Sequence, residues 1–277
     1  MKDSEHGLTS ITLFRGDCIE GMRRLENELI DLVVTSPPYN LGTKYRTYRD
    51  NKQRGEYRAW CVEWAKEIHR ILKQDGSFFL NIGGAPSDPM LPFNIASEFA
   101  PRLFVLQNVI HWIKAISISS EEGNIVSKGH FKPISSRRFL NDCHEFVFHF
   151  TKLGHTPIDR LAVGVPYTDK TNISRWGHTN GRDLRCRGNT WFIPYKTIRD
   201  RDRERPHPAS FPPELVENCI RLHGRNRVRT MLDPFVGIGN AAVAAQRCGV
   251  PKFLGFDIDA HYLDVAAERT RALVVDH

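Results

Sequence analysis

The chain has 277 residues, of which 40% are hydrophobic, and its formal net charge is +7 at pH 7. This length suits one large α/β domain, or one such domain with an insert. The excess of positive charge favours an anionic partner. The first ten residues lack the apolar core of a secretory signal, no apolar run is long enough to cross a bilayer, and the six cysteines form no CxxC pair. We therefore expect a cytoplasmic protein with reduced thiols and no metal site.

The N-terminal half predicts strands and helices in alternation. A short strand over 11–14 and a short helix precede an apolar strand over 29–35, and residues 40–55 are predicted to form a mobile polar loop. Apolar residues recur every four positions over 56–73, which predicts a helix that stops near Gly76. The remaining predicted segments of this half are strands over 77–82, 105–113 and 145–150, and a loop over 117–138 that is rich in serine, glycine and charge.

The second half begins with a long stretch of weak periodicity. From about residue 152 to residue 206, arginines crowd the sequence and are interleaved with Trp176, Trp191, Phe192 and Tyr195. Regular alternation then resumes, with a helix over 213–222, a strand over 228–232, a helix over 240–248, a strand over 253–256 and a helix over 260–273. This order of elements predicts an α/β fold with a mostly parallel sheet.

The first candidate ligand site is a glycine turn between a strand and a helix. It is the run Asp-Pro-Phe-Val-Gly-Ile-Gly-Asn over 233–240. Gly237 and Gly239 let the backbone approach a ligand closely. Asp257 ends the next strand, where a carboxylate can accept hydrogen bonds from both hydroxyls of a ribose. A glycine pair alone fits an ordinary turn, but the pair together with this acid predicts a nucleoside-type ligand.

NAD is an alternative ligand, because Gly237, Gly239 and Ala242 also fit the loose dinucleotide fingerprint. Two features count against it. The sequence ends soon after Asp257, so we expect no second mononucleotide-binding half downstream. Asp233 precedes the turn, where it would repel a pyrophosphate. A zwitterionic ligand with an amino group is more compatible with that acid.

The second candidate site is Ser36-Pro37-Pro38-Tyr39, which closes the apolar strand over 29–35. In open α/β sheets, ligands bind at the carboxyl ends of the strands. Both prolines have a fixed φ and no N–H, so the carbonyls and the Ser36 hydroxyl are predicted to face one planar ligand, on which Tyr39 can stack. Acceptors aimed at an exocyclic amino group would favour a pyramidal nitrogen able to attack a methyl sulfonium.

The sequence argues against two other reactions on bases. Methylation of cytosine C5 needs a cysteine nucleophile, and no cysteine follows a proline or lies in the 36–39 loop. Zinc-dependent deamination needs the H-x-E and P-C-x-x-C patterns, and the sequence has neither. A proline-rich turn at the end of a core strand is the structural alternative for the tetrapeptide taken alone.

Together these segments resemble the amino-methylating DNA methyltransferases of the permuted β group. Ser36-Pro37-Pro38-Tyr39 is similar to their catalytic motif, and the 233–240 run is similar to their S-adenosylmethionine motif. Asp257 matches their ribose-binding acid. The catalytic motif precedes the cofactor motif, which is the order of this group. The resemblance covers nearly the whole chain except residues 152–205.

The resemblance implies a Rossmann-like methyltransferase sheet with a circularly permuted motif order and an inserted target-recognition region. Residues 1–151 would form the catalytic half of the methyltransferase domain, and residues 206–277 its cofactor-binding half. The target-recognition region would span 152–205.

The resemblance also implies S-adenosylmethionine as the cofactor. Gly16-Asp17-Cys18 is similar to the segment whose acid lies near the cofactor adenine, and the segment over 207–212 is similar to the one that precedes the cofactor helix. Ile238 and Asn240 stand where the family usually has Ser and Thr, so hydrogen bonds to the cofactor carboxylate are expected to differ. The implied cofactor residues are Asp17, His207, Phe211, Asp233, Pro234, Phe235, Gly237, Gly239, Asn240 and Asp257.

The form of the catalytic motif bears on the substrate. In the family, Ser-Pro-Pro-Tyr is commoner in N4-cytosine enzymes and Asp-Pro-Pro-Tyr is commoner in N6-adenine enzymes. We therefore expect site-specific methylation of cytosine N4 in DNA, with adenine N6 as the alternative. RNA and protein amide methyltransferases usually place the cofactor motif first, which disfavours them. A non-catalytic DNA-binding module with a vestigial pocket is the remaining alternative.

The expected partner is double-stranded DNA. Methylating a paired base requires flipping it from the stack, and Tyr39 would hold the extruded base. A cognate restriction endonuclease and a homodimer are further partners that the sequence allows but does not identify, and DNA binding would place the protein at the nucleoid. The residues expected to contact phosphates or guanine edges are Arg175, Arg182, Arg185 and Arg187, with a second basic strip at Lys128, Lys132, Arg137 and Arg138.

Overall fold

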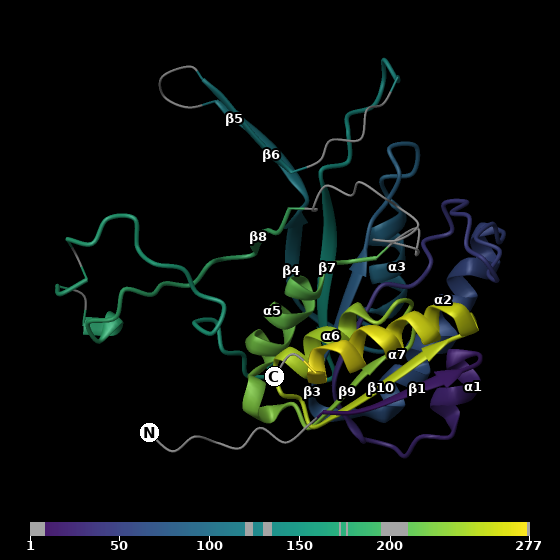
Figure 1. Ribbon diagram of the computed structural model, residues 1–277. Coiled ribbons are helices and arrows are strands. Elements are labelled where there is room, and N and C mark those ends of the chain that lie inside the picture. The colour runs from purple at the N-terminus through teal and green to yellow at the C-terminus, as the bar shows by residue number, and fades with distance from the viewer. Residues whose placement is uncertain are drawn as a thin grey trace.

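The protein is an open α/β sheet with helices on both faces (Figure 1). The structure, a computed structural model, describes residues 9–119, 124–129, 135–171, 173–175, 177–194 and 210–275. The main sheet has the strand order β1-β10-β9-β2-β3-β7-β4-β8. Its strands are β1 (Ser10–Arg15), β2 (Ile30–Thr35), β3 (Leu72–Ile82), β4 (Val105–Ile113), β7 (His144–Thr151), β8 (Thr190–Phe192), β9 (Thr230–Asp233) and β10 (Lys252–Asp257).

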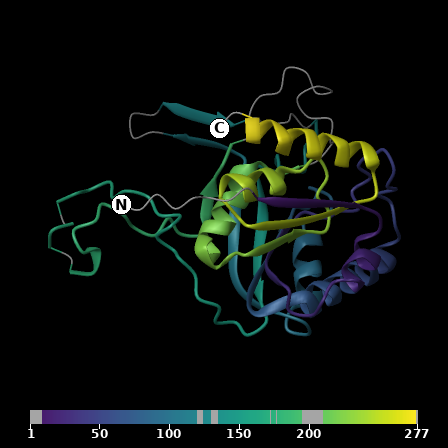
Figure 2. The same cartoon turned by 60° about the horizontal axis from the view of Figure 1, so that its bottom comes forward.

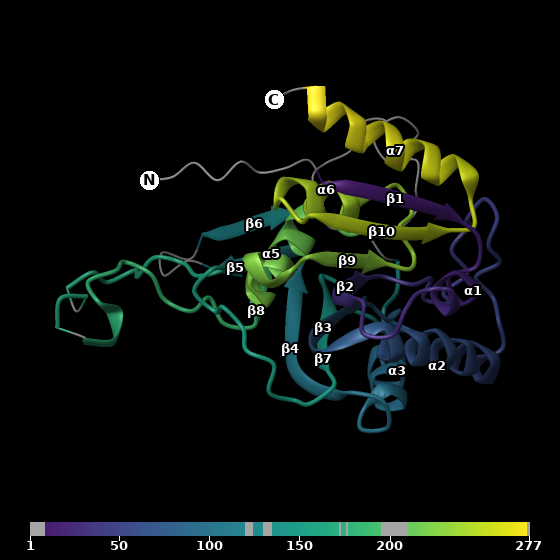
Figure 3. The same ribbon diagram turned by 90° about the horizontal axis from the view of Figure 1, so that it is seen from below.

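Helices cover the two faces in two groups (Figure 3). One group is α1 (Cys18–Arg23), α2 (Arg54–Ile71) and α3 (Leu91–Phe99), and the other is α5 (Pro213–His223), α6 (Asn240–Arg247) and α7 (Ala260–Val275). Each group buries its own hydrophobic cluster against the sheet. Successive residues of a strand point to opposite faces, so Met231 of β9 joins the α5–α6 cluster and Leu232 joins the α2–α3 cluster. The α/β fold predicted from the alternation of elements is confirmed.

The centre of the sheet places two loops side by side. Strand β2 lies between β9 and β3 and runs parallel to both. The chain leaves β2 towards α2 on one face of the sheet, and it leaves β9 towards α6 on the other face. A crevice therefore opens at the carboxyl ends of β2 and β9, where the direction of the connections changes.

The predicted loop over 117–138 is corrected in part. Strands β5 (Ala115–Ser119) and β6 (Ile125–Gly129) form a separate two-stranded antiparallel ribbon that projects from the sheet (Figure 1). The Ile-Ser-Ile-Ser run over 116–119 has the period of two that a strand needs. The neighbouring glycine and charged residues obscured that period in the sequence.

The predicted helix over 56–73 ends earlier than expected. Helix α2 ends at Ile71, and Leu72 is already extended and pairs with Ile30 as the first residue of β3. The register then shifts, because the next paired residues are Leu32 and Ser77. Gly76 therefore lies in an irregular part of β3 and does not stop the helix, and close packing against the Leu72 side chain leaves no room there for a Cβ.

The region of weak periodicity is mainly an irregular arm. Residues 152–163 still pack against the body, where Thr156 and Val163 are buried, and the segments 164–171, 173–175 and 177–188 form an arm that extends away from it (Figures 1 and 2). Strand β8 then returns the chain to the edge of the sheet beside β4. Trp191 in β8 is only 1% exposed, so it belongs to the core, whereas Trp176 and Tyr195 lie outside the described residues.

A chain of polar side chains links β4, β7, β3 and α5 through the core, with Asn108 partly buried and the others buried. The Asn108 amide nitrogen can only donate, so Nδ1 of His149 accepts its hydrogen bond at 3.0 Å. His149 Nε2 then donates to Ser77 Oγ, and Ser77 donates to His223 Nδ1, both at 2.9 Å. Burial lowers the pKa of His149 to about 3 and that of His223 to about 4, so both imidazoles are neutral in the folded protein.

This arrangement predicts acid-sensitive stability. Below pH 6.5 the unfolded chain binds protons at His149 and His223 that the folded protein does not bind. The free energy of unfolding should therefore fall from pH 6.5 towards pH 4, by up to about 1.4 kcal/mol per pH unit for each imidazole. Asn at position 223 keeps an acceptor for Ser77 but does not titrate, so His223→Asn should flatten this slope in urea unfolding. The exposed His155→Asn variant is the control, and parallel slopes for the wild type and His223→Asn would contradict the prediction.

No helix within the described residues is both long and apolar enough to cross a membrane.

Candidate active site

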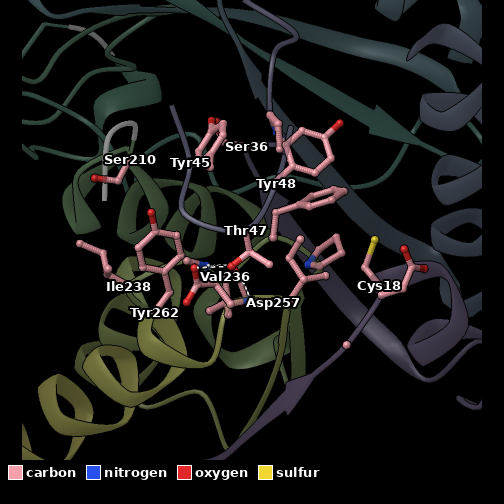
Figure 4. Close-up of a pocket in the computed structure, with 18 of the residues that line it drawn as sticks. Cys18, Ser36, Tyr45, Thr47, Tyr48, Ser210, Val236, Ile238, Asp257 and Tyr262 are labelled. Carbon is pink, nitrogen blue, oxygen red and sulfur yellow. Dashed lines mark hydrogen bonds between the residues drawn. The ribbon is translucent and has the colours of Figure 1, made fainter. Parts of the chain in front are cut away.

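A cavity of about 280 Å³ opens at the carboxyl ends of β2 and β9 (Figure 4). Both predicted sites contribute to its wall, because Ser36 and Pro38 line it together with Gly237 and Asp257. The two segments lie far apart in the chain, and the pairing of β2 with β9 brings them together. The structure therefore joins the two candidate sites into one.

The glycine turn is fastened to the acid that follows the next strand. Gly237 has φ +50°, and its N–H donates to Asp257 Oδ2 at 2.9 Å. The Asp259 N–H donates to the other carboxylate oxygen of Asp257 at 2.8 Å. Burial raises the pKa of Asp257, and these backbone hydrogen bonds oppose that rise. The carboxylate is thus held at the wall of the cavity with acceptor capacity left for a ligand.

Gly239 serves the fold and does not line the cavity. Its φ is +80°, and a Cβ there would lie 2.7 Å from the Ala266 Cβ of α7. Glycine is needed at this position so that α6 and α7 can pack closely. The sequence predicted that both glycines let the backbone approach a ligand, but of the two only Gly237 lines the cavity.

Asn240 begins α6 and presents an unused acceptor. Its Nδ2 donates to the Phe211 carbonyl at 2.6 Å, and both residues line the cavity. Its Oδ1 is buried and has no hydrogen-bond partner among the described residues. Buried polar atoms are almost always paired in folded proteins, so this oxygen points to a ligand with a hydrogen-bond donor. His207, the other residue expected from this segment, lies outside the described residues.

Asp233 lies behind the cavity wall and not on it. It is 1% exposed, and its Oδ1 accepts from Thr35 Oγ1 at 2.6 Å and from the Phe235 N–H at 3.0 Å. Its Oδ2 has no partner within the described part of the chain. Burial raises the pKa of Asp233 to about 7. Its neighbours Pro234 and Phe235 line the cavity.

The cavity is acidic as well as aromatic. Asp17, Asp257 and Asp259 line it, with Lys52 as the one cation among its described lining residues. Asp17 also caps α1, accepting the N–H groups of Ile19 and Glu20. Three acids against one lysine favour a ligand with hydroxyl donors or positive charge and disfavour a pyrophosphate. The aromatic lining residues are Tyr45, Tyr48, Trp60, Phe211, Phe235 and Tyr262.

The polar segment after the Ser-Pro-Pro-Tyr motif forms a wall of the cavity that was not expected from the sequence. Asp50 is 3% exposed, and its carboxylate accepts the N–H groups of Asn40, Leu41 and Thr43. The resulting fold of residues 40–52 brings Tyr45, Thr47, Tyr48 and Lys52 to the cavity. Thr47 Oγ1 also donates to Asp259 Oδ2 at 2.7 Å. Two tyrosines in a polar stretch were the signal available in the sequence.

The tetrapeptide predicted to be catalytic faces the cavity with Ser36 and Pro38, whereas Pro37 and Tyr39 are not among the residues that line it. The Tyr57 hydroxyl donates to the Pro38 carbonyl at 2.8 Å, so this carbonyl is already engaged. Tyr39 lies next to Ser36, with 2.8 Å between the two hydroxyl oxygens. The expectation that every carbonyl of the motif faces the ligand is therefore too broad.

The residues expected to contact DNA lie away from the core. Arg175, Arg182 and Arg185 are exposed on the arm, and Arg137 and Arg138 are exposed after the β5–β6 ribbon. Arg187 is half-buried and donates to the Val163 carbonyl at 3.0 Å, so it also holds the base of the arm. Lys132 lies outside the described residues. A role of these side chains in DNA binding stays a prediction.

Comparisons with known proteins agree with this geometry. The family of N6/N4 DNA methylases matches residues 30–268. The type II methyltransferase M.ScaI of Streptomyces caespitosus is 27% identical over 276 residues, which cover 95% of this chain and 82% of that protein.

Two solved structures share the fold. The cytosine-N4-specific PvuII DNA methyltransferase superposes with a TM-score of 0.67 at 21% identity, covering 95% of this chain and 86% of that one. TTHA0409 of Thermus thermophilus, complexed with S-adenosylmethionine, superposes with a TM-score of 0.60 at 21% identity, covering 96% of this chain and 94% of that one.

The burial of Asp233 predicts an unusual pH dependence of stability. Between pH 4 and pH 7 the unfolded chain loses a proton from this carboxyl that the folded protein keeps, so the free energy of unfolding should fall as the pH rises. Asn fits the same contacts but has no such proton. The free energy of unfolding of Asp233→Asn, taken relative to that of the wild type, should therefore rise by about 1 kcal/mol or more between pH 5 and pH 7. Denaturant unfolding at both pH values tests this, with the exposed Asp264→Asn as the control. If the two proteins differed by the same free energy of unfolding at pH 5 and at pH 7, the prediction would be contradicted.

Proposed function

The chain belongs to the N6/N4 DNA methylase family, and we propose that it transfers a methyl group from S-adenosylmethionine to the exocyclic N4 of cytosine in DNA. One observation carries this proposal. Ser36, at the end of β2, and Gly237, in the turn after β9, line the same cavity. A methyl donor bound at the glycine turn would meet a base held at Ser36.

The residues of the cavity fit S-adenosylmethionine. Asp257 would accept the ribose hydroxyls, and the unpaired Asn240 Oδ1 would accept from the amino group of the methionine part. The apolar Ile238, where the family usually has serine, lines the cavity without offering a hydrogen bond to the carboxylate. When bound, the cofactor supplies an electrophilic methyl group on a sulfonium sulfur. The acidic lining favours this positive charge, and the aromatic rings can add cation–π attraction.

The reacting base would be held by acceptors and not by a nucleophile. Ser36 Oγ, which lines the cavity, would accept an amino hydrogen of the base, which exposes the nitrogen lone pair to the methyl carbon. Such acceptors act without reorganising because the prolines and the buried β2 strand fix them. Alignment of the two reactants supplies the rest of the acceleration.

The choice of cytosine rests on Ser36. The family resemblance links the serine form of the motif with N4-cytosine enzymes, and the PvuII enzyme with the similar fold is cytosine-N4-specific. Adenine N6 beside N1 presents the same pattern of donor and acceptor as cytosine N4 beside N3, so N6-adenine methylation is the second candidate function. It is supported by the family, whose members include both activities.

DNA recognition would come from the arm. In this proposal residues 152–205 form the target-recognition region, and residues 1–151 and 206–277 are the catalytic and cofactor-binding halves around one cavity. The exposed arginines of the arm would neutralise phosphates or read guanine edges, while Tyr39 holds the flipped base.

Nucleoside mass spectrometry tests the reaction. Unmethylated DNA treated with the protein and S-adenosylmethionine should yield N4-methylcytosine after digestion. Ser36→Ala should lower the rate by about 10²-fold or more, since it removes a fixed acceptor of the reacting amino group. Ser97→Ala, at an exposed serine of α3, is the matched control. N6-methyladenine without N4-methylcytosine would overturn the choice of base, and no methylated nucleoside at all would overturn the proposed function.

Cofactor binding tests the assignment of Asp257. Asp257→Asn replaces one acceptor oxygen by a donor, so the Kd for S-adenosylmethionine should rise by about 10- to 100-fold in calorimetry. The surface variant Asp264→Asn should bind like the wild type. An unchanged Kd for Asp257→Asn would show that the ribose lies elsewhere.

A further inference from the structure

A partly buried carboxylate lies behind the Ser-Pro-Pro-Tyr motif. Glu145, near the start of β7, is paired with Lys114 at 3.0 Å, and their side chains are only 14% and 15% exposed. The Tyr39 hydroxyl and the Asn81 amide nitrogen both donate to the second oxygen of Glu145 at 3.0 Å. Three donors converge on two oxygens, which is the arrangement of an ionised carboxylate, since that form only accepts.

This carboxylate sets the direction of the hydroxyl groups in the motif. Tyr39 has one hydroxyl proton, and the charged Glu145 is a stronger acceptor at 3.0 Å than the Asn81 carbonyl at 3.2 Å. With that proton given to Glu145, the Tyr39 oxygen accepts from the Ser36 hydroxyl at 2.8 Å. Ser36 Oγ is thereby left with lone pairs for an amino group in the cavity that it lines.

We propose that Glu145 acts through Tyr39 on Ser36, fixing Ser36 as an acceptor and taking up the proton released by methyl transfer. This inference rests on the proposed function, but it holds for an amino group of cytosine or of adenine. It makes Glu145 a positioning residue, because Glu145 reaches the substrate only through two hydroxyl groups.

Methyl transfer releases one proton, which can move along the hydrogen-bonded groups Ser36, Tyr39 and Glu145. The amino nitrogen bonds to the methyl carbon while the carbon–sulfur bond breaks, and sulfur keeps that electron pair. The nitrogen then carries one proton too many. That proton passes to Ser36 Oγ, the Ser36 proton passes to Tyr39 Oη, and the Tyr39 proton passes to Glu145. The products are a neutral methylated amine, a neutral thioether and a protonated Glu145, which returns its proton to water before the next turnover.

The surroundings suit this role. Glu145 and Tyr39 pack against Gly83, where an added Cβ would lie 2.9 Å from Glu145 Cγ and 3.4 Å from Tyr39 Cε2. Among the described residues, the groups that face the carboxylate include Lys114, Tyr39 and Asn81, with His144 next to it in β7 and His111 beside His144. Lys114 holds Oε1, so Oε2 is the oxygen directed at Tyr39.

The test compares two glutamates in similar settings. Glu217 in α5 is 13% exposed and paired with Arg221 and Arg247, far from the motif in the sequence. Single-turnover methyl transfer should slow by about 10²-fold or more in Glu145→Gln, within the range for a lost acid–base group, and stay unchanged in Glu217→Gln. The Kd values of Glu145→Gln for S-adenosylmethionine and for DNA should not change. A wild-type rate in Glu145→Gln would overturn the proposal.

Two further variants separate the relay from a purely structural role. Tyr39→Phe keeps the ring but removes the hydroxyl that links Ser36 to Glu145. The double variant Tyr39→Phe/Glu145→Gln should therefore be no slower than the slower of the two single variants, as for residues that act as one unit. Ser36→Asp places a carboxylate directly at the amino group. Added to Glu145→Gln, it should therefore raise the rate of methyl transfer at least about tenfold above that of Glu145→Gln alone. The relay would be overturned if the rate losses of Tyr39→Phe and Glu145→Gln multiplied in the double variant, or if Ser36→Asp restored no rate to Glu145→Gln.

These outcomes are distinct from failure of the proposed function. If the wild type forms N6-methyladenine, cytosine is the wrong base, and the same variants still test Glu145 on adenine. If the wild type methylates no DNA, both the proposed function and the relay are overturned. Thermal unfolding of Glu145→Gln and Lys114→Met identifies a loss of fold. If Glu145→Gln unfolds at the same temperature as the wild type but transfers methyl groups slowly, the relay is supported.

Discussion

The pairing of β2 with β9 is the constraint on which the rest of the structure depends. Leu32 pairs with Met231 and Val33 with Leu232, so the two halves of the chain meet in the middle of the sheet. Side chains hold this seam at both ends. Asp31 Oδ2 accepts the N–H groups of Arg229 and Thr230 at one end. At the other end, Thr35 donates to Asp233. A slip of one residue would turn every side chain of β2 to the wrong face.

The seam also explains the odd chemistry of Asp233. This acid is too buried to bind a solvated ligand directly, and its raised pKa is a cost of that burial. Its Oδ1 ties the end of β2 to the start of the glycine turn through Thr35 and the Phe235 N–H. The acid that precedes the turn thus fixes the distance between the two halves of the cavity, while Asp257 offers its carboxylate at the cavity wall.

Much of this arrangement was predictable from the sequence because it is local. The apolar run over 29–35, the glycine turn and Asp257 each lie within a short segment, and their places at the ends of strands follow from the rules of parallel sheets. The wall formed by residues 40–52 was not predictable, since Asp50 accepts N–H groups seven to ten residues earlier in a loop that has no regular period. The β5–β6 ribbon was missed because flanking glycine and charge outweighed a short alternating pattern.

Glu145 was missed for a topological reason. The start of a strand normally lies at the edge away from the ligand, so a glutamate at position 145 read as the first residue of an ordinary strand. Strand β7, however, runs antiparallel to β3, and Phe146 pairs with Ile82, the last residue of β3. The beginning of β7 therefore lies at the edge where β2 and β3 end. Within the described part of the chain, β7 is the one reversed strand of this sheet, and its direction brings a carboxylate to the Ser-Pro-Pro-Tyr loop; only the sheet order reveals it.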